Sequence, residues 1–165
     1  MGNLLVMKDG SEIIRYADPQ IPLYITDGRL SDFSDMRAFC HWHDDIELTF
    51  ALGGHMMYEV DGERIRLDKG GGIFIAPHQM HYGYSADGTD CSFLCIVFNT
   101  DILSQNKALR ENYIAPLEQG GQFPFIALPS SDKTGKTVFS LRSELYRMRK
   151  RGDPGCEIDE IDVLN

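Results

Sequence analysis

Short apolar runs, broken at close intervals by turns that contain glycine, fill the middle of the chain and restrict its possible folds most. Turns such as Gly53-Gly54, Asp61-Gly62 and Gly70-Gly71-Gly72 separate these runs. Asp-Gly between two alternating runs is a strong signal for a two-residue hairpin. Many short strands at even spacing predict an all-β sandwich or barrel. The predicted strands are 36–41, 46–52, 55–60, 63–67, 72–76, 80–85 and 91–98.

The segments that flank this region add shorter elements. Apolar stretches near residues 4–7, 12–16 and 21–26 alternate with turn residues, so we expect strands and turns before the main region. After it, the pattern predicts short helices at 101–106 and 109–117 and one more strand at 125–128. We therefore expect the barrel to occupy residues 1–128, with a short helical insertion near 100–117.

The last part of the chain has helical periodicity. Its apolar residues follow one another at intervals of three, four and three, which forms one narrow stripe. Such a stripe either packs on the barrel or pairs with the same helix of a second subunit. A second helical pattern runs up to Asn165 without a stop signal. We therefore expect residues 129–165 to form a helical tail that is cut before a further domain. The stripe consists of Val138, Leu141, Leu145 and Met148.

Charge and composition exclude several classes of protein. The chain has 165 residues, with 16 Lys and Arg against 25 Asp and Glu and a net charge of −9. Nucleic-acid binding needs clustered cations, so direct contact of these residues with DNA is not expected. No apolar run reaches the roughly 18 residues of a membrane span, and no secretory signal is visible. Four cysteines without a C-x-x-C pair indicate reduced thiols and a cytoplasmic protein.

One group of side chains has the composition of a metal-binding or ligand-binding site. His41, His43 and Glu47 stand at i, i+2 and i+6, which puts them on one face of a strand that is not bulged at Asp44-Asp45. His81 lies on a later predicted strand and is expected to meet them across the barrel. Imidazoles with one carboxylate suit Zn, Ni, Fe or Mn. The alternative is a metal-free pocket in which the same groups form hydrogen bonds to a ligand.

This pattern resembles the first cupin motif, H-x-H-x3-E-x6-G, in which Gly54 supplies the final position. The second motif, G-x5-P-x-G-x2-H, is matched by Gly70 and His81, whereas Ala76 replaces its proline and His78 its inner glycine. The resemblance implies a mainly β fold, the double-stranded β-helix or jelly roll, with a ligand pocket inside the barrel. The C-terminal helices would follow this barrel.

A narrower resemblance covers nearly the whole chain. The sequence from Phe39 to Leu48, the run 91–98 and the helices that follow are similar to the N-terminal sensor domain of AraC-type transcription regulators. This resemblance implies that the barrel binds a small effector, often a sugar, and that the helices form a homodimer. It also implies that DNA is bound only by a C-terminal helix-turn-helix domain that is missing from this chain. A metal-dependent cupin enzyme, such as an isomerase, epimerase or dioxygenase, is the alternative, since such a centre has open positions for substrate.

Other residues are candidates for the pocket wall or its surroundings. Trp42 has the opposite strand parity to the histidines, so we expect it to face outward against a helix or the second sheet. His55 is expected to be a packed or rim residue. The predicted ligand-binding residues are His41, His43, Glu47, Thr49, Tyr58, His78, His81 and Phe93.

Overall fold

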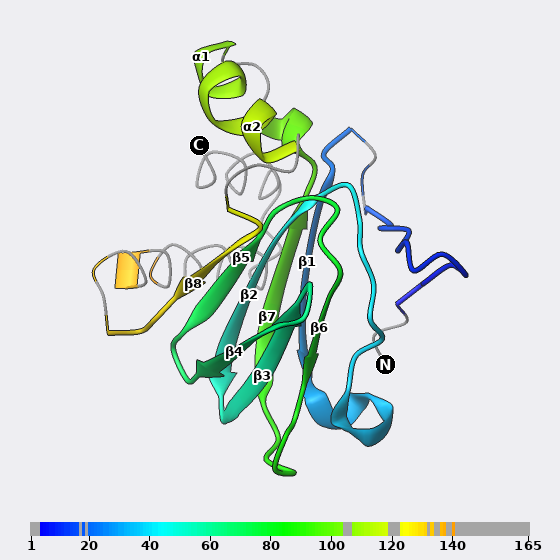
Figure 1. The fold of residues 1–165 in the computed structure, drawn as a ribbon, viewed down its shortest axis with the longest axis vertical. Helices are drawn as coiled ribbons and strands as arrows, with labels where there is room; N and C mark the ends of the chain where they lie inside the picture. Colours follow the sequence, from blue (N-terminus) through cyan, green and yellow to red (C-terminus); the bar gives the residue numbers. More distant parts are fainter. Residues whose placement is uncertain are drawn as a thin grey trace.

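The computed structural model describes residues 4–16, 18, 20–103, 107–118, 123–131, 133, 136, 137 and 140. Its ribbon is dominated by β-strands, with a helical segment at one end (Figure 1). Within these residues, no helix has the length and apolar character needed to cross a membrane.

Two antiparallel sheets form the barrel. The larger sheet has the strand order β1-β7-β2-β5-β8, and the smaller has the order β4-β3-β6. This arrangement confirms the expected cupin jelly roll. The larger sheet consists of β1 (Leu23–Arg29), β2 (Ile46–Gly53), β5 (Gly72–Ile75), β7 (Ser92–Phe98) and β8 (Phe125–Leu128). The smaller sheet consists of β3 (His55–Val60), β4 (Glu63–Asp68) and β6 (His81–Tyr84).

The two faces of the larger sheet bury different sets of side chains. On β2, Ile46 and Phe50 belong to a core cluster that also holds partly buried residues of the helical segment, such as Leu117. Ala51 belongs to a second cluster, which joins the larger sheet to Met56 and other residues of the smaller sheet. Because side chains alternate along a strand, the residues between the outer apolar positions of β2 point into the barrel. Polar residues of β2 that occupy these inward-facing positions are therefore buried.

The β3–β4 hairpin forms as the Asp-Gly signal predicts. Val60 pairs with Glu63, and the two residues between them have positive φ angles, 48° at Asp61 and 89° at Gly62. A two-residue type I′ turn requires this conformation at both positions, and its twist matches that of the flanking strands.

Among the described residues, helical turns of α, 3-10 and π type fall in the region predicted to be helical, while residues 104–106 lie outside that part of the chain. The helical insertion comprises η3 (Thr100–Leu103), α1 (Lys107–Leu109), a π-helical turn η4 (Arg110–Ile114) and α2 (Ala115–Glu118). Figure 1 shows α1 and α2 at one end of the barrel. The strand predicted at 125–128 is also present as β8. The predicted stripe Val138, Leu141, Leu145 and Met148 lies outside the described residues.

Two predicted strand regions are wrong. Residues 36–41 do not form a strand, because the chain there leaves the 3-10 turns η1 (Leu30–Asp32) and η2 (Ser34–Met36) and touches β6 only through isolated bridges at Arg37 and His41. The apolar stretches at 4–7 and 12–16 likewise make only isolated bridges. In both places the alternation of apolar residues indicated which side chains turn inward, but the backbone does not form the hydrogen-bond ladder of a strand.

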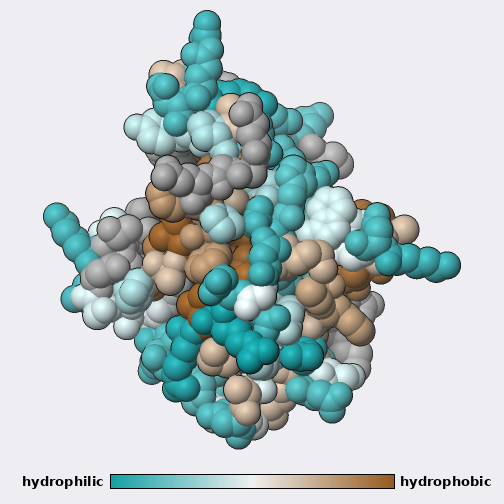
Figure 2. All heavy atoms as spheres, in the orientation of Figure 1, coloured by the Kyte–Doolittle hydropathy of each residue, from teal (hydrophilic) through white to brown (hydrophobic). Residues whose placement is uncertain are grey.

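Much of the visible surface is hydrophilic. On the face seen in Figure 2, hydrophilic residues surround a smaller apolar area. Exposed large apolar residues include Phe123 and Ile126, beside and on the edge strand β8, and Phe39, which precedes the histidine motif. Scattered exposure of this kind is ordinary for a folded protein.

Candidate functional site

The four motif residues meet inside the barrel although they do not share one strand. The chain bends at Asp44 and Asp45, so His41 and His43 precede β2, while Glu47 lies on it. The unbulged strand expected for these three residues is therefore not formed. His41 instead forms a backbone bridge to His81 at the start of β6, with N–O distances of 3.1 and 2.8 Å. The bend and the bridge bring all four buried side chains together.

Each histidine ring is held by its Nδ1 atom. Nδ1 of His41 lies 2.7 Å from the carbonyl oxygen of Phe39, and Nδ1 of His81 lies 2.8 Å from that of Gln79. Nδ1 of His43 is 3.0 Å from the Asp45 carbonyl oxygen. A carbonyl oxygen only accepts hydrogen bonds, so Nδ1 carries the proton in each ring. The lone pair of a neutral ring is then on Nε2.

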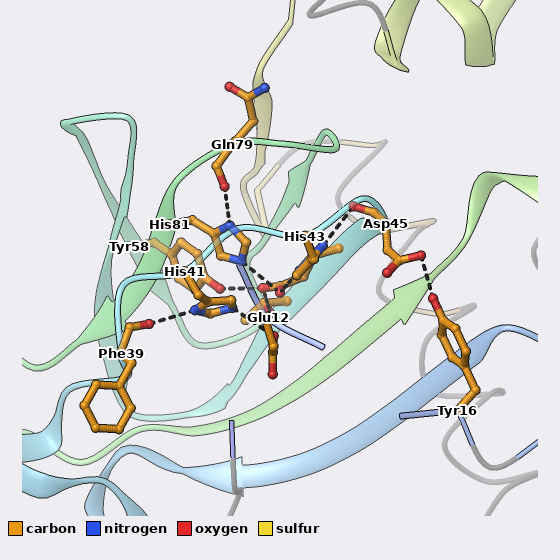
Figure 3. A network of polar contacts seen from close by, with 11 residues as sticks. Glu12, Tyr16, Phe39, His41, His43, Asp45, Tyr58, Gln79 and His81 are labelled. Atoms are coloured by element: carbon orange, nitrogen blue, oxygen red, sulfur yellow. Dashed lines mark hydrogen bonds and ion pairs between the residues drawn. The ribbon is translucent and has the colours of Figure 1, made fainter. Parts of the chain in front are cut away.

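All three Nε2 atoms face carboxylate oxygens (Figure 3). Nε2 of His43 and of His81 lie 3.4 and 3.2 Å from Oε2 of Glu47. Nε2 of His41 lies 3.3 Å from Oε2 of Glu12. Burial lowers the pKa of His41 to about 4, so this ring is neutral near pH 7. When Glu12 is ionised, two acceptor atoms therefore face each other across a short gap, which costs free energy because neither atom supplies a proton.

Glu47 has a different role for each of its oxygens. Oε1 accepts hydrogen bonds from the Thr49 hydroxyl at 2.8 Å and from the Tyr58 hydroxyl, whereas Oε2 faces the histidines. Burial by itself would raise the pKa of Glu47, but His81 and His43 hold that pKa well below its usual range. Burial likewise opposes the charged form of His43, and the Glu47 carboxylate outweighs it and raises the pKa of His43. Glu47 is thus a fixed, ionised carboxylate.

The donor set fits a first-row divalent ion. One potential ligand atom from each of His41, His43, Glu47 and His81 lies within 4.8 Å of the others. Two ligands bonded to one ion at about 2.0–2.2 Å are at most about 4.4 Å apart, so small side-chain shifts would bring the set to bonding distance. The Nδ1–carbonyl contacts supply the orientation that metal-binding histidines need.

A cavity of about 320 Å³ opens beside this cluster. Its wall includes His41 and Glu47, and the predicted residues Thr49, Tyr58 and Phe93 line it as well. His43 and His81 are not among the lining residues, and they contact Glu47 from behind it.

His78 does not line this cavity either, contrary to the prediction. Its side chain is half exposed, and its Nε2 lies 2.9 Å from Oδ1 of Asp44. The backbone explains the difference, because His78 has a φ of 67° and donates its N–H to the His43 carbonyl oxygen. The residue therefore holds the His43 loop from outside.

Trp42 and His55 also lie outside the cavity wall. Trp42 faces away from the cluster, but it packs against the N-terminal segment rather than a helix or a sheet, with its Nε1 at 3.3 Å from the Asp9 carbonyl oxygen. His55 is partly buried, and its Nε2 lies 2.9 Å from Oδ2 of Asp87.

Sequence reasoning missed Glu12. Its side chain is only 10% exposed and lines the cavity, and its N–H donates to the Trp42 carbonyl oxygen. Burial raises the pKa of Glu12 to about 7. One sequence feature pointed to it: Glu12 and the apolar Ile14 stand two residues apart, as side chains on one face of an extended segment do, and both line the cavity. Cys95, one of the cysteines expected to be reduced, is free and also lines the cavity.

Comparison with known families decides the class of this domain. The model of the AraC-like ligand binding domain matches residues 28–122, which is more than half of the chain. The chain belongs to the family of AraC-like ligand-binding domains. It is therefore an effector-binding regulatory domain, and the matched residues include all of β2–β7. His41, His43, Glu47 and His81 all fall inside that range as well, so the cluster is complete within it.

The chain is also similar to a curated protein and to solved structures. YdeC of Bacillus subtilis (strain 168), described as an uncharacterized HTH-type transcriptional regulator, is 21% identical over 160 residues, or 96% of this chain. ToxT from Vibrio cholerae O395, solved with (E)-4-(8-methylnaphthalen-1-yl)but-3-enoic acid, shares the fold at a TM-score of 0.55 and 9% identity over 85% of this chain. A cupin protein from Bacteroides fragilis is 25% identical over 47% of this chain and 66% of its own, at a TM-score of 0.40. The AraC-like domain spans 54% of YdeC and 53% of ToxT.

Proposed function

We propose that this AraC-like domain senses a small, sugar-like metabolite and controls DNA binding by a helix-turn-helix domain outside the 165 residues. The effector occupies the cavity beside Glu47, and a divalent metal is held by His41, His43, Glu47 and His81. The observation that carries the proposal is the common orientation of the three imidazoles. Each Nδ1 is bonded to a backbone carbonyl, which leaves each Nε2 facing the interior.

The cavity suits a polar ligand of modest size. Its volume of about 320 Å³ is at the lower end of the usual range for small-molecule sites. Its wall combines aromatic rings with acceptor groups such as Glu12 and Glu47. Hydroxyl groups of a sugar-like molecule can donate to these acceptors, and a metal ion beside the cavity would act as a Lewis acid toward an oxygen of the ligand.

Dimerisation and DNA control are the further parts of the proposal. The sequence stripe Val138, Leu141, Leu145 and Met148 is proposed as the contact between two subunits. Effector binding then acts through the relative populations of dimer arrangements. DNA contact is assigned to the remainder of the regulator because the net charge of these residues, −9, opposes it.

Metal content tests the site directly. Purified protein incubated with Zn²⁺, Ni²⁺, Fe²⁺ or Mn²⁺ and then desalted should keep about one ion per chain. His41→Ala and His81→Ala should lose it, whereas His55→Ala, which changes a histidine outside the cluster, should retain it. Full metal content in the two cluster variants would contradict the ligand assignment.

The dimer is tested separately. Leu141→Asp combined with Leu145→Asp should convert a dimer into a monomer in analytical ultracentrifugation, because two charges in an apolar seam are costly. An unchanged sedimentation coefficient would exclude the stripe as the subunit contact.

A metal-dependent cupin enzyme is the second candidate, because His41 and Glu47 border both the donor cluster and the cavity. A ligand there would have access to the centre. Turnover of a sugar or small acid by the metal-loaded chain, lost in His41→Ala, would favour the enzyme. Binding without turnover favours the sensor.

A further inference from the structure

The cavity wall is acidic and has no cationic counterpart. Four carboxylates line it, namely Glu12, Asp27, Asp32 and Glu47, and no Lys or Arg is among the described residues of the wall. Asp27 and Asp32 are exposed, whereas Glu12 and Glu47 lie deep. Proteins that recognise carboxylates or phosphates place Arg or Lys at the site. The wall has the opposite character.

Glu12 is the deep carboxylate that the metal cluster does not use. One of its oxygens faces Nε2 of His41, a ring whose proton is engaged on Nδ1 with the Phe39 carbonyl. No Lys or Arg pairs with Glu12 among the described residues, so no permanently charged cation compensates its ionised form there. A divalent ion at the cluster would be bonded to Glu47 and would leave Glu12 as the free acceptor.

Aromatic rings face the same space. Phe33 and Phe93 lie in the wall with a centroid distance of 6.3 Å and an interplanar angle of 28°, and Tyr24 joins them from β1. The faces of aromatic rings attract cations, and the attraction grows when the cation is removed from water. Aromatic rings combined with buried carboxylates are therefore complementary to an organic cation.

We propose that the effector carries a protonated amine or an equivalent cationic nitrogen, which Glu12 binds inside the cavity. This inference rests on the proposed function, because it names the chemical class of the molecule that the sensor domain binds. Asp27 and Asp32 at the mouth favour entry of a cation, and the aromatic rings cover its apolar part. An anionic molecule of the same shape is disfavoured, since no Lys or Arg of the described wall would pair with its charge.

Matched ligands that differ only in charge test this selectivity. Two triplets serve as probes: benzylamine, benzyl alcohol and benzoate, and glucosamine, glucose and glucuronate. Their binding to the whole chain, in the metal state in which it is purified, is measured by saturation-transfer NMR and by titration calorimetry. The amine of at least one triplet should bind about tenfold or more tightly than its carboxylate, the scale of one charge-assisted hydrogen bond.

Substitutions test whether Glu12 is the residue that produces the preference for the amine. Glu12→Gln should weaken the amine by about tenfold and leave the neutral member of the triplet nearly unchanged. Glu59→Gln is the matched control, because Glu59 pairs with Arg64 away from the cavity wall. This control should retain the full preference for the amine.

The outcomes separate this inference from the proposed function. Equal or tighter binding of a carboxylate, or an amine preference that survives in Glu12→Gln, would overturn the inference and leave the sensor function standing. Failure of every probe to bind would count against the cationic effector and also against a functional cavity.

Discussion

Nε2 of His41 lies 3.3 Å from Oε2 of Glu12, and both side chains are buried. The contact joins the N-terminal segment to the histidine motif inside the barrel, where both residues line the cavity (Figure 3). Because Nδ1 of His41 donates to the Phe39 carbonyl, the neutral ring offers no proton to Glu12. This contact therefore destabilises the metal-free protein when Glu12 is ionised.

Glu12→Gln should stabilise the metal-free protein at pH 8, where the buried carboxylate is charged. A glutamine amide can donate to Nε2, so the free energy of unfolding should rise by about 1 kcal/mol. Urea unfolding in EDTA measures the change, and Glu63→Gln at an exposed position of β4 should change the stability by less than about 0.5 kcal/mol. A loss of stability in Glu12→Gln would contradict the assigned tautomer of His41.

Tyr58→Phe and Thr49→Ala should each weaken metal binding by about tenfold, because their hydroxyls fix Oε1 of Glu47 and so orient Oε2. Competition with a chromophoric chelator measures the affinity. Tyr24→Phe is the control, since Tyr24 lines the same cavity without a hydrogen bond to Glu47 among those of the described residues. Unchanged affinity in both test variants would show that Glu47 needs no such support.

Gly54→Ala should destabilise the fold far more than Gly62→Ala. Both glycines have positive φ angles, 74° and 89°, but a Cβ on Gly54 would come within 2.0 Å of the Asp90 carbonyl oxygen, whereas nothing lies within 4 Å of one on Gly62. We expect a loss of about 4 kcal/mol at Gly54 and about 1 kcal/mol at Gly62. Equal losses in thermal or urea unfolding would show that the turn after β2 relaxes freely.

The sequence predicted the strands that have both alternation and turn residues. The β3–β4 hairpin follows from Asp61-Gly62, and the helical insertion follows from the change of period after Asn99. It also predicted that His41, His43, Glu47 and His81 meet. Residues 36–41 were misassigned because an isolated bridge buries side chains as a strand does, without the ladder of hydrogen bonds.

The cavity wall was harder to predict. Glu12 reaches the site through tertiary packing of the N-terminal segment on Trp42, and the alternation of Glu12 with Ile14 does not by itself reveal what the segment packs against. His78 stands two residues after Ala76 in the second motif, yet its left-handed backbone turns the side chain toward Asp44. The alternation of side chains along a strand does not continue through such a turn. For this reason the sequence-based prediction of His78 at the pocket was wrong.

The central claim is that the histidine–glutamate cluster of this AraC-like domain holds a metal beside an effector cavity. Crystals of protein loaded with Zn²⁺, measured just above and just below the zinc absorption edge, test it most directly. We expect one anomalous peak per chain, about 2.0–2.2 Å from Nε2 of His41, His43 and His81 and from an oxygen of Glu47. A map with no peak at the cluster, at full occupancy of the four side chains, would contradict the account.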